Sequence, residues 1–368
     1  MFGKNDTRHI DLHLPQSWNR CTTEELEAIA AAIITEQQRV DRYHPFDWQR
    51  VKLCVVLAVN SMAVVEDGSG LRVHGSGSYQ PSSISHQPSD ISPQPSDIES
   101  TWLVQRPEDK EPWPITTGQL LALTEQLAWI DDEKASKLIF RFPYMEMTLA
   151  QGSKSKVQGS GFMVHGSKRK AQGSKPSTIN RDCNATLSKR EPLTVVGPPP
   201  LLDGYTWKEY RWLTDWMQEY IRCNNATERL TTDTEREQNQ AALDRARNEF
   251  LAIMFKPAGK PTGTVPSDSF ADFSSVKWQV VLFWWSSLMQ QLSGKFPKVF
   301  HSSNIGKKRK PRGNSPWDFY NLVTATIQKY IGGLSAHDVD GQPYGVVLQQ
   351  LEMMAEEAAE MEKLRHKK

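Results

Sequence analysis

The feature that most constrains this chain is a strongly apolar stretch at residues 276–300, which reads VKWQVVLFWWSSLMQQLSGKFPKVF. Large apolar side chains recur in it at three- and four-residue spacing, which predicts one wide helical face. Val280, Phe283 and Trp284 fall off that face, so the helix is apolar almost all round and we expect other helices to pack on several of its sides. The residues on the face are Trp278, Val281, Leu282, Trp285, Leu288, Met289 and Leu292.

This stretch is a core or interface helix and not a membrane span. Its uninterrupted apolar run, VVLFWW, is far shorter than the roughly 20 residues that cross a bilayer. Gly294 and Pro297 are expected to end the helix. It contains no group that suggests a reaction, so its role is to organise the rest of the fold.

Length and charge set wide bounds on function. The 368 residues are enough for two domains, and a net charge of +1 gives no reason to expect a nucleic-acid or membrane partner. Twelve Trp residues favour large aromatic cores or contact surfaces. The four cysteines are scattered without a CxxC pair, which favours free thiols over a disulfide framework. The first residues lack the apolar region of a signal peptide, which indicates a cytoplasmic protein.

Residues 1–66 and 101–150 have the pattern of a small α+β domain. Short strands are predicted at residues 9–14, 102–107 and 137–149, where apolar and polar side chains alternate. Three helices are predicted between them, each with a capping residue at its start. The first is capped by Thr22 or Thr23 and buries Leu26, Ile29, Ile33 and Val40, the second starts at about Asp47, and the third is capped by Thr116 or Thr117.

Two low-complexity insertions interrupt this pattern. Residues 67–100 hold three successive seven-residue copies, QPSSISH, QPSDISP and QPSDIES, and their Pro and Ser content predicts disorder. Residues 151–200 form a basic Gly/Ser-rich linker with repeated QGSK units. Its patch at Lys168, Arg169 and Lys170 is compatible with loose phosphate binding, but no aromatic residues are interleaved for base stacking, so a plain linker is favoured.

Residues 201–368 are predicted to form a helical domain. A helix opened by Thr206 is rich in aromatic residues, including Trp207, Trp212 and Trp216. A more polar helix follows at residues 227–255, before the apolar stretch. Another helix is expected at residues 316–331, with Ser315 as its cap and Pro316 at its first position.

The last predicted helix starts at about Tyr344 and carries apolar residues at alternating steps of four and three. Val347, Leu351, Met354 and Met361 belong to this pattern, which lasts for two heptads. Two interpretations stay open: a coiled coil that makes a homo-oligomer, or a terminal helix packed on its own bundle.

The sharpest charge run is GKKRKPRG at residues 306–313. A cluster of this kind is typical of nucleic-acid patches, but here it joins two predicted helices and is bounded by Gly and Pro, so a solvated loop is favoured. The candidate nucleic-acid contacts are Lys307, Lys308, Arg309, Lys310 and Arg312.

No familiar catalytic or cofactor motif is present. The sequence contains no G-x-x-x-x-G-K-[ST] phosphate loop, no G-x-S-x-G elbow, no H-E-x-x-H and no G-x-G-x-x-G. His9 and His13 lie on one side of the first predicted strand, but no third ligand is nearby. We therefore expect no enzyme activity, no metal and no cofactor.

Two sets of segments resemble a poorly characterised family that is carried by prophages and mobile elements of Bacteroidetes-type bacteria, among tail and structural genes. The first set is HIDLHLPQSWNRCTTEELEAIA with WQRVKLCVVLAV. The second is YTWKEYRWLTDWMQEYI, WQVVLFWWSSLMQQLSGKFPKVF and WDFYNLVTATIQKYIGG with the final helix. The resemblance implies a role in phage morphogenesis, as a tail-assembly chaperone or minor structural component. It supplies no catalytic or binding residues.

The sequence thus predicts a mainly α protein: a small N-terminal α+β unit, a C-terminal helical bundle and two disordered insertions. The expected function is a non-enzymatic interaction protein of phage assembly, in the cytoplasm of a bacterial host or associated with the virion. Its partners would be other phage structural or assembly proteins, or a second copy, with no membrane; the alternative is a nucleic-acid-binding accessory protein of a mobile element. The candidate partner contacts are Trp207, Trp212, Trp216, Trp284, Leu351 and Met354.

Overall fold

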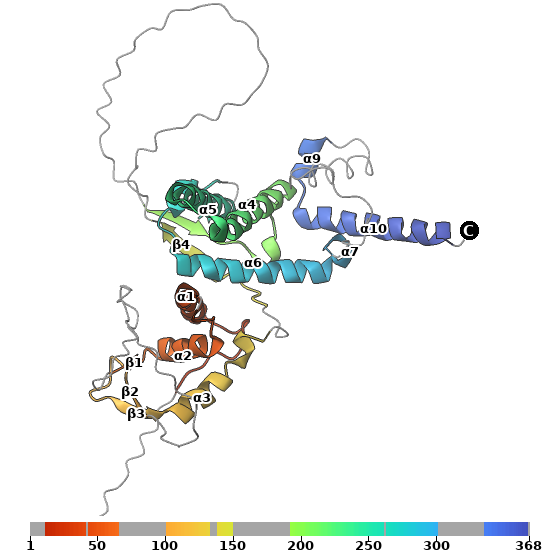
Figure 1. The fold of residues 1–368 in the computed structure, drawn as a ribbon. Helices are drawn as coiled ribbons and strands as arrows, with labels where there is room; N and C mark the ends of the chain where they lie inside the picture. Colours follow the sequence, from red (N-terminus) through yellow and green to blue (C-terminus); the bar gives the residue numbers. More distant parts are fainter. Residues whose placement is uncertain are drawn as a thin grey trace, which may run out of the picture.

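Helices dominate the computed structural model, accompanied by two small antiparallel sheets (Figure 1). This confirms the mainly α class. The predicted insertion at residues 67–100, residues 151–191 of the predicted linker, the basic run and the helix expected after Ser315 lie outside the described residues. The predicted end of the linker at residue 200 was wrong, because Leu193–Val196 form a strand. The structure describes residues 12–41, 43–65, 101–132, 138–149, 192–260, 263–300 and 335–366.

The first unit packs helices α1 and α2 together, with α3 against α2 and a sheet in the order β1-β2-β3. Thr22 caps α1 as predicted: its hydroxyl accepts from the Glu25 N–H at 3.2 Å, and the Glu25 carboxylate accepts from the Thr22 N–H at 2.6 Å. Asp47 and Thr116 cap the next two helices. The elements are α1 (Thr23–Arg39), α2 (Trp48–Val59), β1 (Ala63–Val64), β2 (Thr101–Gln105), β3 (Trp113–Thr116), α3 (Thr117–Glu125) and η1 (Ala128–Ile130).

Three local predictions in this region were wrong. Residues 12–14 form no strand, and the rest of that predicted strand lies outside the described part. Val40 is 44% exposed because it follows the last helical turn as the C-cap of α1. The strand predicted at residues 137–149 is confined to β4 (Glu146–Leu149), since the segment before it contains Pro143, which has no N–H to donate to a ladder.

The second sheet joins distant parts of the chain. Strand β4 pairs antiparallel with β5 (Leu193–Val196), which pairs with β6 (Lys256–Pro257). Residues 138–149, assigned from sequence to the first unit, therefore pack with elements of the second. The sheet requires a glycine after β5, because a Cβ at Gly197 would lie 2.4 Å from the carbonyl oxygen of Tyr144 and 2.5 Å from the ring of Phe142.

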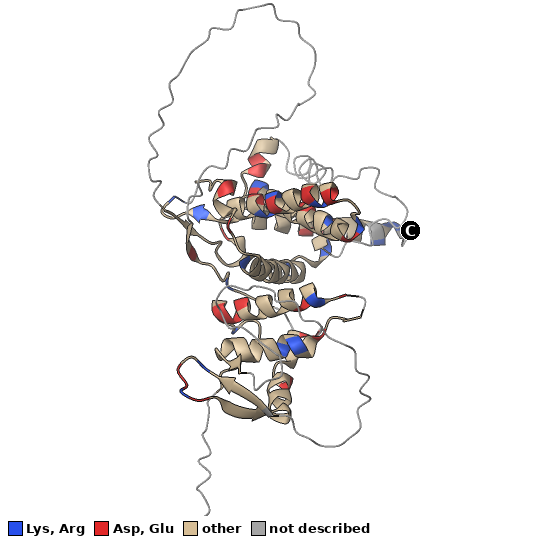
Figure 2. Ribbon diagram, turned by 60° about the vertical axis from the view of Figure 1, so that its left-hand side comes forward, with Lys and Arg blue, Asp and Glu red and all other residues tan. Residues whose placement is uncertain are grey.

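The second half is a layered helical assembly. Helices α4 and α5 lie side by side over α6, and α1 lies against the other side of α6 (Figures 1 and 2). The elements are η2 (Pro200–Leu202), α4 (Trp207–Ala226), η3 (Thr227–Arg229), α5 (Asp233–Met254), η4 (Ser267–Phe270), α6 (Ser275–Lys295), α7 (Pro297–Phe300), α9 (Ala336–Asp340) and α10 (Tyr344–His366).

Helix α6 is the central helix that the sequence predicts, and both halves of the chain cover it. Figure 2 shows it almost without charged residues between the charged outer helices. On the side toward α5, the rings of Trp278 and Trp285 lie 5.6 and 5.1 Å from that of Phe250. On the side toward the first unit, the ring of Trp18 lies 5.3 Å from that of Phe283. One hydrophobic cluster therefore runs through both halves.

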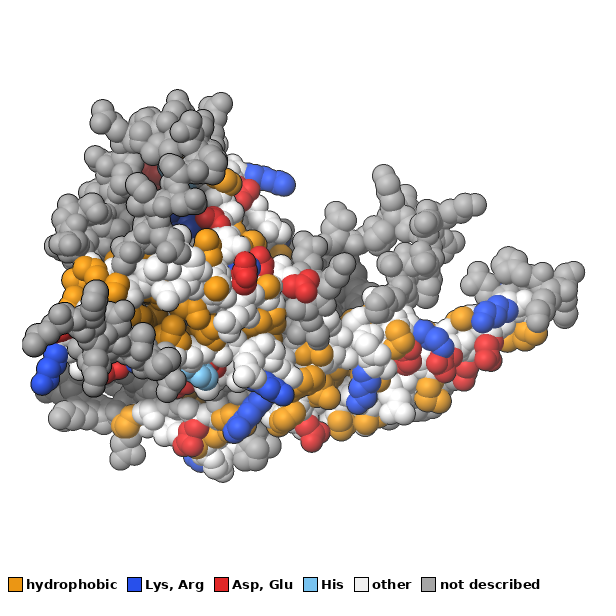
Figure 3. All heavy atoms as spheres, turned by 90° about the horizontal axis from the view of Figure 1, so that it is seen from below, with side chains coloured by type: hydrophobic (Ala, Val, Ile, Leu, Met, Phe, Trp, Pro, Cys, Tyr) orange, Lys and Arg blue, Asp and Glu red, His pale blue; other side chains and the backbone are white. Residues whose placement is uncertain are grey.

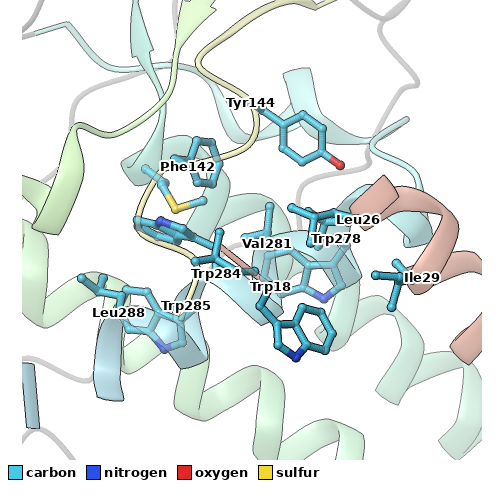
Figure 4. Packing of buried hydrophobic residues seen from close by; sticks show 14 of the residues in the cluster. Trp18, Leu26, Ile29, Phe142, Tyr144, Trp278, Val281, Trp284, Trp285 and Leu288 are labelled. Atoms are coloured by element: carbon cyan, nitrogen blue, oxygen red, sulfur yellow. The ribbon is translucent and has the colours of Figure 1, made fainter. Parts of the chain in front are cut away.

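A buried hydroxyl fixes residues 138–144 on α6. The Ile139 N–H donates to Ser287 Oγ at 2.6 Å, and this hydroxyl donates back to the Ile139 carbonyl at 3.2 Å. Phe142 then packs edge-on against Trp284, with 4.9 Å between ring centroids (Figure 4). This segment covers the part of α6 that would otherwise reach solvent. Helix α6 ends one residue after Gly294, and Pro297 begins α7.

Candidate protein-interaction surfaces

Two of the predicted contact residues belong to the core. Trp284 is 1% exposed under Phe142, so the prediction that it faces a partner was wrong. Trp207 is 2% exposed because the start of α4 is covered: its backbone N–H donates to the Gln342 carbonyl at 2.7 Å, and its ring stacks on Tyr210. Neither side chain is accessible to a partner.

Trp212 and Trp216 line a groove between α4 and α5, with a volume of about 1250 Å³. Trp212 is 36% exposed and Trp216 is half-buried. Together with Ile253 and Val265 they give the groove an apolar surface. We call it the α4–α5 groove. It is lined by Glu209, Trp212, Asp215, Trp216, Gln218, Glu219, Arg222, Ala241, Ala242, Arg245, Glu249, Ala252, Ile253, Lys256, Thr264 and Val265.

Helical periodicity places the groove residues of α4 and those of α5 on facing sides of the two helices. On α4 the groove residues recur every three or four positions, from Glu209 through Trp212 and Trp216 to Glu219. On α5 the small side chains of Ala241, Ala242 and Ala252 alternate with long charged ones. The small residues leave the space that the groove occupies. The Thr206 capping box fixes the start of α4, so the aromatic row has a defined position.

Ion pairs frame the groove. At one end Lys256 is paired with Glu209, and its amine also lies 5.0 Å from the ring of Tyr205. Burial alone would raise the pKa of Glu209, but the hydrogen bonds and charge of Lys256, with the Thr206 N–H, lower it below its ordinary value. At the other end the Arg222 Nε donates to Glu219 at 2.8 Å, and this bond lowers the pKa of that carboxyl. Both rim acids are therefore anionic near neutral pH.

Cations also lie over the two groove tryptophans. The amine of Lys208 is 4.6 Å from the ring centre of Trp212, and the guanidinium of Arg245 is 5.7 Å from that of Trp216. Such contacts restrict the indole rings at a modest gain in stability. The two contacts therefore orient the indole rings that line the groove.

Asp215 lies between the two tryptophans in the sequence of α4, and its surroundings differ from those of the other acids that line the groove. Both of its carboxylate oxygens are buried, and neither has a hydrogen-bond partner among the described residues. Burial raises the pKa of Asp215 to about 6, against an opposing effect of the Arg211 charge. The guanidinium of Arg211 is directed elsewhere, to Asp340 at 2.9 Å. The Trp-x-x-Asp-Trp spacing of the sequence was the signal for this residue, and it was overlooked.

The described thiols are poor nucleophiles. Burial raises the pKa of Cys54 on α2. Burial and the nearby Glu25 raise the pKa of Cys21 to about 12. Burial also raises the pKa of Cys223 on α4. A thiolate at neutral pH is disfavoured at all three positions.

The remaining predicted contacts divide between α10 and the undescribed segments. Leu351 and Met354 are partly buried on α10. The candidate nucleic-acid contacts at residues 307–312, and the patch at residues 168–170, lie outside the described part. Within that part, no cluster of His, Cys, Asp or Glu has the arrangement of a metal site. No helix there combines the length and apolar character needed to traverse a bilayer.

The described groove therefore combines an apolar, aromatic floor with charged ends, an arrangement suited to binding another chain. Its long-range features, such as the pairing of Glu209 with Lys256, could not be read from local sequence. Comparison of the whole chain with protein-family models, with curated proteins and with solved structures finds no match.

Proposed function

We propose that this chain is a non-enzymatic interaction protein that binds a helical segment of a partner protein in the α4–α5 groove. The observation that carries the proposal is the pair Trp212 and Trp216, accessible between two helices and held by cations. Aromatic side chains at the centre of a groove, surrounded by a polar rim, are typical of binding hot spots.

A helix is the occupant that fits this geometry best. A groove between two neighbouring helices accepts a third helix through residues spaced three and four apart. The volume of about 1250 Å³ admits several large side chains from one face of such a helix. The ion pairs at the two ends, Glu209 with Lys256 and Glu219 with Arg222, provide polar contacts for its charged residues.

The biological setting we propose is the assembly of phage particles. Its support is the resemblance of the helical segments to the prophage family, together with the expected absence of an active site. In this setting the protein acts as a tail-assembly chaperone or minor structural component, and the partners are other phage structural or assembly proteins. Adjacent tail-tube and tape-measure genes would support this setting, whereas a gene isolated in a metabolic operon would contradict it.

Replacement of the groove tryptophans tests the binding function. The protein would be co-expressed with each neighbouring gene product, and the affinity of any complex measured by isothermal titration calorimetry. Trp212→Ala and Trp216→Ala should each weaken binding by about tenfold or more, as loss of a hot-spot aromatic does. Tyr43→Ala is a matched control, because Tyr43 is 81% exposed and lies in the first unit. Full affinity in both tryptophan variants would contradict the proposal.

The nucleic-acid alternative rests on the basic run at residues 307–312 and has its own test. Affinity for duplex DNA should fall steeply as salt rises, with a slope of about one log unit per phosphate contact. Replacement of Lys307, Lys308, Arg309, Lys310 and Arg312 by Ser should flatten that slope. Absence of DNA binding at low salt would exclude this function.

A further inference from the structure

The middle of the α4–α5 groove contains two acids that form no ion pair with a described cation. Asp215 has both carboxylate oxygens buried without a hydrogen-bond partner. The Glu249 carboxylate accepts from the Ser267 hydroxyl at 3.2 Å, and this donor is neutral. The acids at the two ends of the groove are instead paired with Lys256 and Arg222. We call Asp215 and Glu249 the mid-groove acids.

The mid-groove acids lie at nearly the same level, one on each helix. Lys256, just after α5, pairs with Glu209 of α4. Farther along, Arg245 of α5 lies over Trp216 of α4, so the two helices run antiparallel. Glu249 comes one turn after Arg245 and therefore lies about one turn before Trp216. The mid-groove acids are thus within about 5 Å of each other along the groove axis.

The two acids can act on an incoming cation in different ways. The oxygens of Asp215 are closed off from solvent, so its charge acts without direct contact. Burial raises the pKa of Asp215 to about 6, which leaves it largely anionic near neutral pH. Glu249 is half-buried and is held by Ser267, so its carboxylate can accept a hydrogen bond from a partner.

The cations next to the groove make other contacts. Lys208 and Arg245 lie over the two groove tryptophans, at 4.6 and 5.7 Å from the ring centres. The guanidinium of Arg211 donates to Asp340 at 2.9 Å, and its charge offsets only part of the effect of burial on Asp215. A cation supplied by a partner would therefore add an interaction that the described chain does not make itself.

Other exposed apolar side chains lack this arrangement. On the end of α10, Met361 and Leu364 are each 59% exposed, and Figure 3 shows acidic and basic side chains mixed along that segment. In the groove, by contrast, the apolar surface adjoins two acids without ion pairs. That combination specifies a partner with apolar and positively charged groups together.

We propose that the helix bound in the α4–α5 groove carries a Lys or Arg at its centre, flanked by large apolar residues, and that this cation pairs with Glu249. The inference rests on the groove-binding function proposed above. Apolar residues three and four positions before and after the cation would pack on Trp212 and Trp216, since these positions share one helical face. The aliphatic stem of the cation covers the same aromatic surface.

The mid-groove acids would also discriminate against other helices. An acidic residue at the centre of the bound helix would face two like charges. A purely apolar helix would cover the Glu249 carboxylate without supplying a charged partner, which costs free energy. A cation offsets that cost through a charge-assisted hydrogen bond. The mid-groove acids therefore determine specificity, while Trp212 and Trp216 supply most of the affinity.

Two designed peptides of about 15 residues test this chemistry on the full chain. Both are alanine-based helices with Leu three and four positions on either side of the centre, and they differ only in a central Lys or Gln. Fluorescence anisotropy of a label on the peptide measures binding. The Lys peptide should bind at least about tenfold more tightly at about 50 mM salt, and added salt should narrow the difference. Equal affinities would overturn the proposal.

Removal of the acids locates the effect. Glu249→Gln should cut the preference for the Lys peptide to about threefold or less, and Asp215→Asn should cut it by a smaller factor, because its oxygens make no direct contact. Neither change should alter the affinity of the Gln peptide, and thermal melts check that both variants remain folded. An unchanged preference in Glu249→Gln would overturn the proposal.

Neutralisation of two other acids is the matched control. Glu228 and Glu237 are exposed near the point where α4 leads into α5, outside the groove. The double variant Glu228→Gln with Glu237→Gln should keep the preference for the Lys peptide. An equal loss in this control would show that the preference reflects the overall charge of the chain, and the proposal would be overturned.

The outcomes separate this inference from the groove function. Equal binding of both peptides that is lost in Trp212→Ala would retain the groove function and overturn only the central cation. Failure of both peptides to bind at about 1 mM would overturn both proposals. Sedimentation equilibrium of the full chain tests a second copy as the occupant. Self-association that Trp212→Ala abolishes would show that the groove binds another copy of this chain, contrary to the proposal.

Discussion

Helices α6 and α10 look alike in sequence yet have opposite surroundings. They contain 21 and 23 residues, and both carry apolar side chains at three- and four-residue spacing. In α6 the apolar face and the residues beside it are enclosed by α5, by residues 138–144 and by Trp18. In α10 only the first turns are enclosed.

The difference in burial between the two helices depends on the residues outside the apolar face. Between its terminal lysines, α6 contains no charged residue, so every side of it can be buried without desolvating a charge. Residues 352–365 of α10 carry charges on most turns, and one narrow apolar face remains. Periodicity therefore predicts a helix, whereas the composition of its flanks predicts how many neighbours it has. The following experiments measure how far this distinction holds, beginning with the largest expected effect.

Trp284→Ala and Trp285→Ala should each cost about 3–5 kcal/mol in the free energy of unfolding, because each removes a large side chain from a closed core. Their exposed fractions are 1% and 7%. Urea denaturation followed by circular dichroism would measure both. If Trp284→Ala unfolded at the same urea concentration as the unchanged chain, α6 would have an open side, and the contrast with α10 would be lost.

Ser287→Ala should cost about 1–3 kcal/mol, because it leaves the buried Ile139 N–H without an acceptor. The neighbouring Ser286 is exposed, so Ser286→Ala provides a matched control with a negligible effect. Chemical denaturation of both variants gives the comparison. Equal effects would show that residues 138–144 do not depend on this hydroxyl to cover α6.

Asp215→Asn tests α4, a helix whose burial is intermediate between that of α6 and that of α10. Because burial raises the folded-state pKa of Asp215 to about 6, its favourable contribution is complete below the ordinary aspartate pKa and is lost as pH rises through 6. The variant should therefore gain stability relative to the unchanged chain between pH 4 and pH 8. Asp215 as a whole residue is partly exposed beside an open groove, so screening by solvent reduces the expected gain to about 1 kcal/mol.

Thermal melts across this pH range would measure the gain. Asp272→Asn is the control for the chemical change itself, because it makes the same substitution at an exposed position. A difference in stability between Asp215→Asn and the unchanged chain that stays constant with pH would contradict the raised pKa of Asp215.

Met361→Ala should change the stability of the monomer by less than about 0.5 kcal/mol, the usual range for an exposed position. Met361 is 59% exposed near the end of α10. Urea denaturation followed by circular dichroism would measure this effect. A cost as large as that of the α6 variants would mean that the end of α10 is buried within the chain.

Local sequence signals predicted much of the fold but not its long-range contacts. Caps at Thr22, Thr116 and Thr206 were identified because each depends on residues within four positions. The burial of Trp284 was missed because it depends on Phe142, which comes from a distant segment. Likewise, Trp212 and Trp216 were chosen as contact residues, yet the groove around them needs α5 and Lys256.

Both repetitive insertions begin and end beside paired antiparallel strands. Val64 of β1 pairs with Val104 of β2, and Leu149 of β4 pairs with Leu193 of β5. Each insertion therefore joins two points that the sheet already holds together, and doubling such a connection costs only about 0.6 kcal/mol in loop closure. Tandem duplication or loss of a repeat unit in the gene is therefore expected to leave both sheets paired.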